Sequence, residues 1–338
     1  MNLNFYDNIL RPNLAVQDDA RYGWGKRASS SEFAVAAQHE INEGLSATVG
    51  VFWRSFANFL VTDNTSGTVA DYTGFSVTPG LIPAPPASAG GQSMPSETNT
   101  SGFYNINPGV VVNNVTGLSQ TMFPGSNVYD RWFGYDLTLN ARLSSGLTLQ
   151  GGLATGHQTT DFCDVQDPAK AGNNALVEMV ALAGTSLAAC HMEQNWLPQV
   201  KFLGSYTIPK VDVQLGFSFQ SIPGVEYAAT YAAPNSDVSR PVSQGGLGRL
   251  PAGAVATGTT NVALIQPGST YGPRFNQVDA RLGKVVRFGG RRAVASLDLF
   301  NVLNSDTVSN ASAVYSTWLA PSAVVAPRLM KVSLTFDF

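Results

Sequence analysis

Hydrophobic and polar residues alternate one by one over many short segments of this chain, which is the pattern of β-strands with one apolar and one polar face. In residues 328–338, large apolar side chains take every second position, and polar side chains fill most positions between them. The same alternation recurs at 33–41, 45–54, 133–143, 147–154, 200–208, 211–220, 277–288 and 293–299. The sequence therefore predicts nine strands in an all-β, antiparallel fold.

Short turns and long loops alternate strictly between these strands. The turns lie at 42–44, 144–146, 209–210 and 289–290, and the predicted loops at 62–130, 157–197, 221–274 and 304–327. Every short turn therefore falls at one rim and every long loop at the other, an asymmetry typical of outer-membrane barrels. A soluble Greek-key or jelly-roll protein with long insertions is the alternative. The charges on the predicted polar face argue against this soluble alternative, because they suit the water-filled lumen of a membrane barrel. This polar set comprises Asp136, Asn140, Arg142, Asp212, Gln214, Gln220, Asp279 and Arg281.

The composition agrees with a chain whose apolar residues are dispersed. Of its 338 residues 44% are hydrophobic but only 13% are charged, well under the usual quarter. No run approaches the roughly 18 apolar residues of a spanning helix. The net charge of -3 gives no basic surface, so we expect no nucleic-acid partner.

The side chains that carry chemistry are few. Cys163 and Cys190 lie in one predicted loop, which favours a disulfide formed in an oxidising compartment over two unrelated thiols. With two Cys and three His in the chain, a zinc site is not expected. No His has a recognisable Ser or Asp partner motif, so the sequence predicts neither an enzyme nor a cofactor.

The predicted strand count is odd, whereas single-chain bacterial barrels have even counts with both termini on the periplasmic side. Residues 1–30 read as loop and carry no export signal. We therefore expect residues 1–338 to be the C-terminal portion of a single, larger barrel domain, whose signal and earlier strands lie on preceding sequence.

Four stretches carry a resemblance to a known family. They are VGVFWRSFANFLVTDN (49–64), YDRWFGYDLTLNARLSSGLTLQGGLATG (129–156), YGPRFNQVDARLGKVVRFGGRRAVASLDLFNVLN (271–304) and APRLMKVSLTFDF (326–338). With these stretches the chain resembles the C-terminal barrel region of TonB-dependent outer-membrane receptors. The likeness is to the Oar-like, carboxypeptidase-regulatory-domain type that is abundant in acidobacteria. Its most specific elements are DLFNVLN at 298–304 and the terminal Phe338.

The resemblance implies the last nine strands of a 22-stranded barrel in the bacterial outer membrane, importing an extracellular solute. A carbohydrate or a peptide is the expected kind of solute. The partners implied are outer-membrane lipid, the barrel-assembly machinery and, through a plug domain absent from this sequence, the TonB complex. The assembly machinery would read Leu334, Phe336 and Phe338 in the closing strand. A plug-less porin or a structural or adhesive barrel is the alternative.

Aromatic residues in the predicted extracellular loops are the candidate ligand contacts. They are Tyr104, Tyr129, Trp196, Tyr227, Tyr231, Tyr315 and Trp318. The alternative is an interfacial girdle, where aromatic rings at loop bases contact lipid headgroups. For the outer girdle we expect Trp53, Trp132, Phe133 and Tyr135, and for the periplasmic one Tyr206, Phe288 and Phe338.

Overall fold

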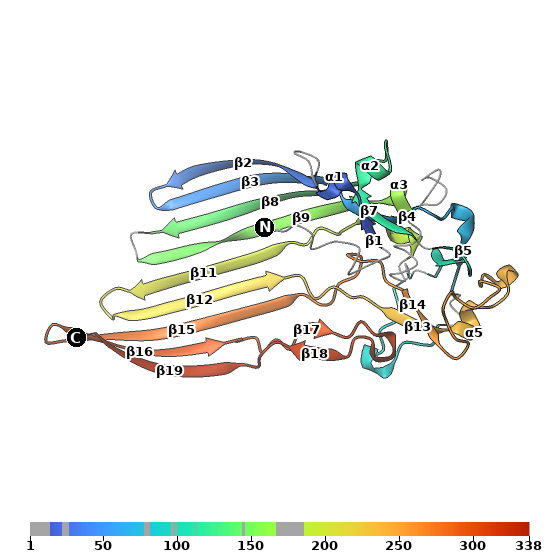
Figure 1. The fold of residues 1–338 in the computed structure, drawn as a ribbon. Helices are drawn as coiled ribbons and strands as arrows, with labels where there is room; N and C mark the ends of the chain where they lie inside the picture. The colour runs from blue at the N-terminus through green and yellow to red at the C-terminus, as the bar shows by residue number, and fades with distance from the viewer. Residues whose placement is uncertain are drawn as a thin grey trace, which may run out of the picture.

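Nine long strands form one antiparallel sheet in a computed structural model, which describes residues 14–21, 27–77, 82–95, 98, 100–111, 113–143, 146–166 and 186–337. Each long strand pairs with the long strands before and after it in the chain, so these nine form a simple meander (Figure 1). The strands are β2 (Ser29–Asn42), β3 (Leu45–Ala57), β8 (Tyr129–Arg142), β9 (Leu147–Asp161), β11 (Gln199–Ile208), β12 (Val213–Ile222), β15 (Phe275–Phe288), β16 (Arg291–Phe300) and β19 (Leu329–Asp337). The short strand β10 (His191–Glu193) is the tenth strand of the sheet and pairs with β9. The predicted all-β antiparallel fold and its nine strands are confirmed.

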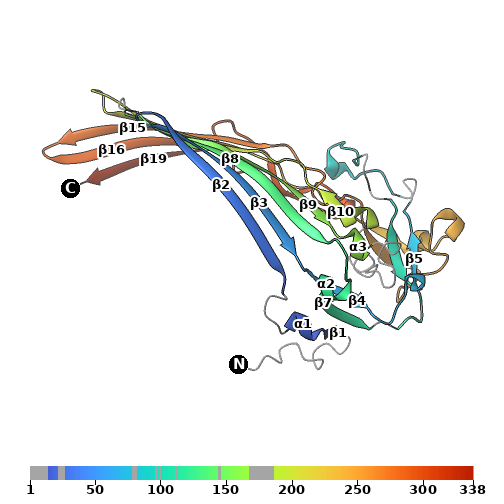
Figure 2. The same ribbon diagram turned by 90° about the horizontal axis from the view of Figure 1, so that it is seen from above.

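The short turns gather at one end of the sheet and the long connections at the other (Figure 1). Figure 2 shows the sheet as a curved wall with β2 and β19 at its edges. The turn between β15 and β16 has only two residues, Gly289 and Gly290, with φ angles of 54° and 78°. Positive φ at both positions is what a tight hairpin requires, and glycine adopts it without strain.

Several predicted strand boundaries were wrong; β2 begins at Ser29 and β8 at Tyr129, each four residues before its predicted start. The strand predicted from residue 211 begins at Val213, because Lys210 and Asp212 take positive φ angles of 69° and 52° in a longer turn. Asp212 therefore does not belong to the polar face of a strand, contrary to the prediction. It forms an ion pair with Arg287 at the turn end of the sheet. In the opposite direction, β9 continues to Asp161 through residues that were predicted as loop.

Part of residues 1–30, predicted as loop, is also structured. β1 (Leu14–Val16) pairs in parallel with β7 (Asn114–Leu118), which pairs with β4 (Leu60–Asn64). Pairs this short show too little alternation for a sequence pattern to reveal them. The other short elements are α1 (Asp18–Arg21), η2 (Val69–Asp71), β5 (Tyr72–Phe75), η3 (Ala87–Ala89), β6 (Phe103–Ile106), α2 (Ser119–Met122), α3 (Cys163–Gln166), η4 (Leu187–Cys190), β10 (His191–Glu193), β13 (Thr230–Pro234), α5 (Asn235–Val238), η5 (Val242–Gln244), β14 (Thr259–Ala263), β17 (Val308–Ala311), η6 (Tyr315–Thr317) and β18 (Pro321–Val324).

In the part of the chain that the structure describes, no helix combines the length and the apolar character needed to span a bilayer.

The main hydrophobic core lies among the long loops rather than on the sheet. We call it the loop core; its buried members come from the three loops after β3, β12 and β16. They are Phe75, Val77, Ala89, Phe103, Ala229, Tyr231, Ala233, Val238, Leu247, Val262, Leu264, Ile265, Tyr315 and Trp318. Polar contacts between the loops reinforce the packing, because Arg249 donates hydrogen bonds to Asn105 Oδ1 at 2.9 Å and Asn107 Oδ1 at 2.7 Å.

The motif DLFNVLN has a local structural role at the end of β16. Asn301 is buried, and its backbone takes a φ of 50°. Its side-chain amide donates to the carbonyls of Ser305 and Ala326, both at 2.9 Å, and its side-chain carbonyl accepts from the Ser305 backbone at 2.8 Å. Asn304 Oδ1 then accepts from the backbone of Arg328 at 3.1 Å. The two asparagines therefore hold the last loop closed in front of β19.

Replacing Trp318 with alanine should open the loop core while leaving the sheet folded. The ring is 1% exposed and donates a hydrogen bond to Ala228 O at 3.1 Å, and removing such a ring costs about 3–5 kcal/mol. We expect trypsin to cut after Arg249 more than about tenfold faster in this variant. Val314→Ala is the matched control, because Val314 is 58% exposed. Equal cleavage rates in the two variants would contradict the loop core.

Candidate functional site

The strand register gathers the apolar side chains on one face of the sheet. Residues opposite each other on neighbouring strands share a face. Val51 lies opposite Tyr135, and Leu215 lies opposite Leu282. We call this surface the apolar face. Its exposed members run across the sheet and include Phe33, Val35, Val49, Val51, Trp53, Phe133, Tyr135, Leu137, Leu215, Phe217, Leu282, Val286, Phe288, Met330, Val332, Leu334 and Phe336.

The exposure of this face is large, with Val332 at 75% and Phe33 at 62%. An uncovered apolar surface across an entire sheet is far larger than the patches of soluble monomers, and marks a surface for lipid or protein. The strands are 9 to 15 residues long, enough for a tilted strand to cross the hydrocarbon core of a bilayer, which takes about 9–11 residues.

The opposite surface, the polar face, carries hydrogen-bonded side chains from strand to strand. Gln220 donates to Gln277 at 3.0 Å, and Gln277 donates to Asp279 at 2.8 Å. Further along, Arg281 lies 3.5 Å from Asp298. The predicted polar set, apart from Asp212, lies on this face. The two surfaces of one sheet are therefore an apolar face and a polar face.

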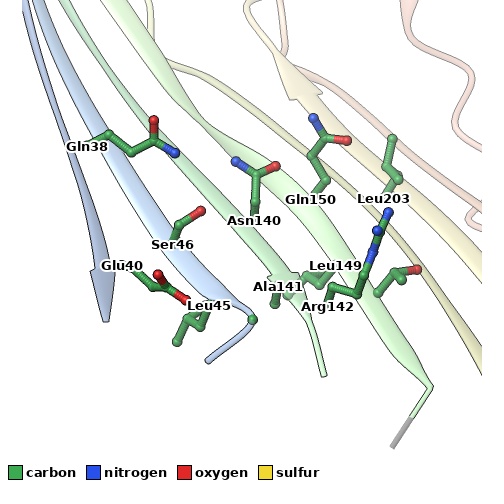
Figure 3. A pocket seen from close by; sticks show the side chains of 12 residues that line it. Gln38, Glu40, Leu45, Ser46, Asn140, Ala141, Arg142, Leu149, Gln150 and Leu203 are labelled. Atoms are coloured by element: carbon green, nitrogen blue, oxygen red, sulfur yellow. The ribbon is translucent and has the colours of Figure 1, made fainter. Parts of the chain in front are cut away.

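A hollow of about 850 Å³ lies on the polar face near the turn end of β2, β3, β8 and β9 (Figure 3). One cross-strand row supplies much of its lining, from Glu40 through Ser46, Asn140 and Gln150 to Leu203. Leu203 is an exception in this row, because its apolar side chain is 54% exposed on the otherwise polar surface.

Aromatic rings cluster on the apolar face at its loop end. The ring centroid of Trp196 lies 6.1 Å from Phe133, 5.4 Å from Tyr135 and 5.6 Å from His157, and Trp53 lies opposite Phe133. We call these five residues the outer aromatic cluster. Trp196, a candidate ligand contact, thus joins the residues expected in the outer girdle.

Trp132 does not belong to that cluster, so its assignment to the outer girdle was wrong. It lies opposite Arg54 and Gln158, on the polar face. Consecutive residues of a strand point to opposite faces, so Trp132 and Phe133 cannot both face the same side. At the turn end, Tyr206 and Phe288 lie on the apolar face, whereas Phe338 lies outside the described residues.

The structure brings some of the loop aromatics together as packing partners. Tyr231 and Tyr315 meet edge to face at 5.4 Å, and Tyr227 meets Trp318 at 6.4 Å. Tyr231, Tyr315 and Trp318 are buried in the loop core, and burial raises the pKa of the Tyr231 and Tyr315 hydroxyls. In this conformation they support the loops from within, and Tyr231 and Tyr315 also line a small hollow of about 320 Å³.

The other two candidates lie apart from these. Tyr104 is on β6, where its ring packs over Gly74. Tyr129 begins β8, and the guanidinium of Arg131 lies 4.1 Å from its ring centroid. The seven residues therefore do not converge on one pocket.

Cys163 and Cys190 form a disulfide with a Cα–Cα distance of 4.8 Å, which confirms the predicted bond. Next to it, His191 Nδ1 lies 2.9 Å from Asp161 and His191 Nε2 lies 3.5 Å from Glu193. The hydrogen bond that His191 donates to Asp161 is the main cause that raises the pKa of His191, and the bond to Glu193 adds to it. The disulfide and this acidic pair anchor β10 beside the loop end of β9.

Among the described residues, no group of three or more His, Cys, Asp or Glu is placed to hold a metal ion. His157 is bound to the carbonyl of Gln194 and lies 3.1 Å from Thr159 Oγ1.

No family model and no curated protein matches this chain. Among solved structures it is similar to the outer-membrane transporter YddB from Escherichia coli, at 9% identity and a TM-score of 0.43, covering 91% of this chain and 32% of that one. It is also similar to the ferripyoverdine receptor of the outer membrane of Pseudomonas aeruginosa, at 9% identity and a TM-score of 0.41, covering 91% and 27%. The chain thus spans about a third of the length of these proteins. We therefore base the proposed function on the geometry of this chain.

The measured pKa of His191 should lie above its ordinary value of 6.5. A raised folded-state pKa means that the imidazolium stabilises the fold fully below pH 6.5, and that this contribution is lost as the pH rises through the folded-state pKa. NMR titration of the imidazole signals measures it. Asp161→Asn should lower the pKa, and Glu193→Gln should lower it less. A wild-type pKa at or below 6.5 would contradict the contact with Asp161.

Proposed function

We propose that this chain forms part of the wall of a bacterial outer-membrane β-barrel receptor that imports an extracellular solute. The observation that carries the proposal is the division of one nine-stranded sheet into an exposed apolar face and a hydrogen-bonded polar face. In this role the apolar face contacts lipid, the polar face lines the lumen, and the long loops lie outside the cell.

Backbone chemistry supports the same role. In a bilayer, backbone N–H and C=O groups must be paired within the protein, because no water is present to bind them. Hydrogen bonding between neighbouring strands satisfies the seven inner strands of the sheet. The outer edges of β2 and β19 would have to be covered by further strands. We propose that residues 1–338 belong to a single barrel domain of 22 strands.

The exposed side chains of β19 support a role in barrel assembly. Leu334 and Phe336 are 59% and 50% exposed on the apolar face, so an assembly machine could read them before lipid covers them. Phe338, the third residue of the proposed signal, lies outside the described residues. The TonB complex would act through a plug domain on another part of the intact protein. The Oar-like type stays a prediction that rests on the sequence motifs.

A charge placed on the apolar face should impair membrane insertion, whereas the same charge on the polar face should not. Leu137→Arg tests the first case, because Leu137 lies in the middle of β8 on the apolar face. An arginine facing lipid near the midplane costs about 2–4 kcal/mol. We expect a smaller fraction of the Leu137→Arg protein to float with liposomes in a density gradient.

Thr138→Arg is the matched control, because Thr138 is the next residue of β8 and lies on the polar face. The control should float like the wild-type protein. If the two variants float equally well, or if the control is the more impaired, the apolar face is not the lipid-facing surface and the proposed function falls.

A further inference from the structure

A second cavity, of about 870 Å³, opens on the polar face at its loop end. Residues of β2, β3, β8 and β9 line it, together with Gln194, Leu197 and Gln199. Of the charged and aromatic residues in its wall, Phe52, Arg54, Trp132 and Asp136 belong to the polar face of β3 and β8. We call it the upper cavity. In the proposed role of the polar face, the upper cavity lies at the loop end of the surface that lines the lumen.

The floor of the upper cavity is an aromatic platform built on glycines. Gly134 and Gly156 lie opposite each other on β8 and β9, and a Cβ atom on either would collide with the indole ring of Trp132. The ring therefore lies along the sheet over both glycines. Gly50 on β3 leaves room in the same way for the Asp136 carboxylate and the ring of Phe52. Only the absence of side chains at these positions lets the two rings lie so close to the backbone.

Polar groups surround this platform. The amide of Gln158 donates to both carboxylate oxygens of Asp130, at 2.9 and 3.1 Å. Arg54 lies 3.8 Å from Glu32. Asp136 differs, because its Oδ1 is buried and has no hydrogen-bond partner among the described residues. This oxygen lies over Gly50, beside the ring of Phe52. The Asp136 carboxylate also lines the wall of the cavity, and a ligand hydroxyl can donate a hydrogen bond to it from that side.

The charges of the wall limit the kind of ligand. The lining residues include three carboxylates (Glu32, Asp130 and Asp136) and one guanidinium (Arg54), a net charge of about -2. Anionic solutes are therefore repelled. A cationic solute would have to displace existing partners, because Glu32 and Asp130 are already engaged, and it would face Arg54. A neutral polyhydroxylated ring fits best: its C–H face can stack on an indole, and its hydroxyls can both donate and accept hydrogen bonds.

We propose that the upper cavity binds a neutral saccharide, with the ring of Trp132 as its stacking platform and Asp136 as an acceptor for a sugar hydroxyl. The proposal rests on the proposed function, since it names the class of solute that the receptor would take up. The platform and the acceptor lie on the same strand, four residues apart on one face, so a single sugar ring can reach both.

Isothermal titration calorimetry on the intact receptor that contains this chain, purified in detergent micelles, tests this assignment. The probes are maltohexaose, cellohexaose and xylohexaose, each titrated separately, with hexalysine and ferric citrate as the cationic and anionic comparisons. We expect at least one hexasaccharide to bind, and neither comparison to bind as tightly. Trp132→Ala and Asp136→Asn should each weaken that binding about tenfold or more.

Two further variants separate the platform from general damage to the fold. Gly156→Ala keeps Trp132 but pushes the indole away from the sheet, so it too should weaken saccharide binding. Trp196→Phe is the control, because Trp196 does not line the upper cavity and its ring packs against Phe133 on the apolar face; it should bind like the wild type. The assignment is overturned if no hexasaccharide binds, if hexalysine or ferric citrate binds more tightly, or if Trp132→Ala binds like the wild type. Flotation tests membrane insertion separately, so the two proposals can fail independently.

Discussion

Backbone hydrogen bonding between neighbouring strands is the constraint on which the rest of this structure depends. It fixes the register, and the register decides which side chains share a face. A shift of one residue between β3 and β8 would move Val51 away from Tyr135 and place it beside a residue of the polar face. The separation of an apolar face from a polar face therefore follows from the ladder that also satisfies the backbone inside a membrane.

The long loops are held in place by side-chain packing rather than by a ladder of backbone hydrogen bonds. Three of them share the loop core, so they hold each other in place by burying Phe103, Leu264 and Trp318. In the loop after β9, the disulfide joins Cys163 to Cys190. Aromatic residues are useful in such a core because each ring buries a large area. The same property explains why loop aromatics are ambiguous in a sequence: Trp318 is a packing residue, whereas Trp196 lies on the exterior of the sheet.

The strands were readable from the sequence because alternation is a local property. The two glycines at 289–290 and the long apolar alternation of β19 need no knowledge of the rest of the chain. The pairing of β1 with β7 was not readable, because it joins segments about a hundred residues apart that are only three to five residues long. The disulfide could be predicted from the presence of two cysteines in one loop.

The candidate binding residues were harder to predict. Exposure decides whether an aromatic residue can meet a ligand, and exposure depends on contacts between distant loops. For Trp132 the sequence did contain part of the answer, because this residue precedes Phe133 on the same strand and the two must therefore face opposite sides. The structure adds that Gly134 and Gly156 leave room for the Trp132 ring. The alternation indicated the face, but only the register of β8 with β9 shows that both glycines lie beneath one indole.

The separation of the two faces can be measured along a single strand. Nitroxide labels would be placed one at a time at positions 133–142 of β8 in the membrane-inserted protein, with the Cys163–Cys190 disulfide intact. Relaxation by oxygen, which concentrates in lipid, would be compared with relaxation by a water-soluble nickel chelate. We predict that oxygen accessibility alternates with a period of two and peaks at the odd-numbered positions, which include Phe133, Tyr135 and Leu137. Equal accessibility at odd and even positions, or a peak at the even ones, would contradict a lipid-facing apolar surface.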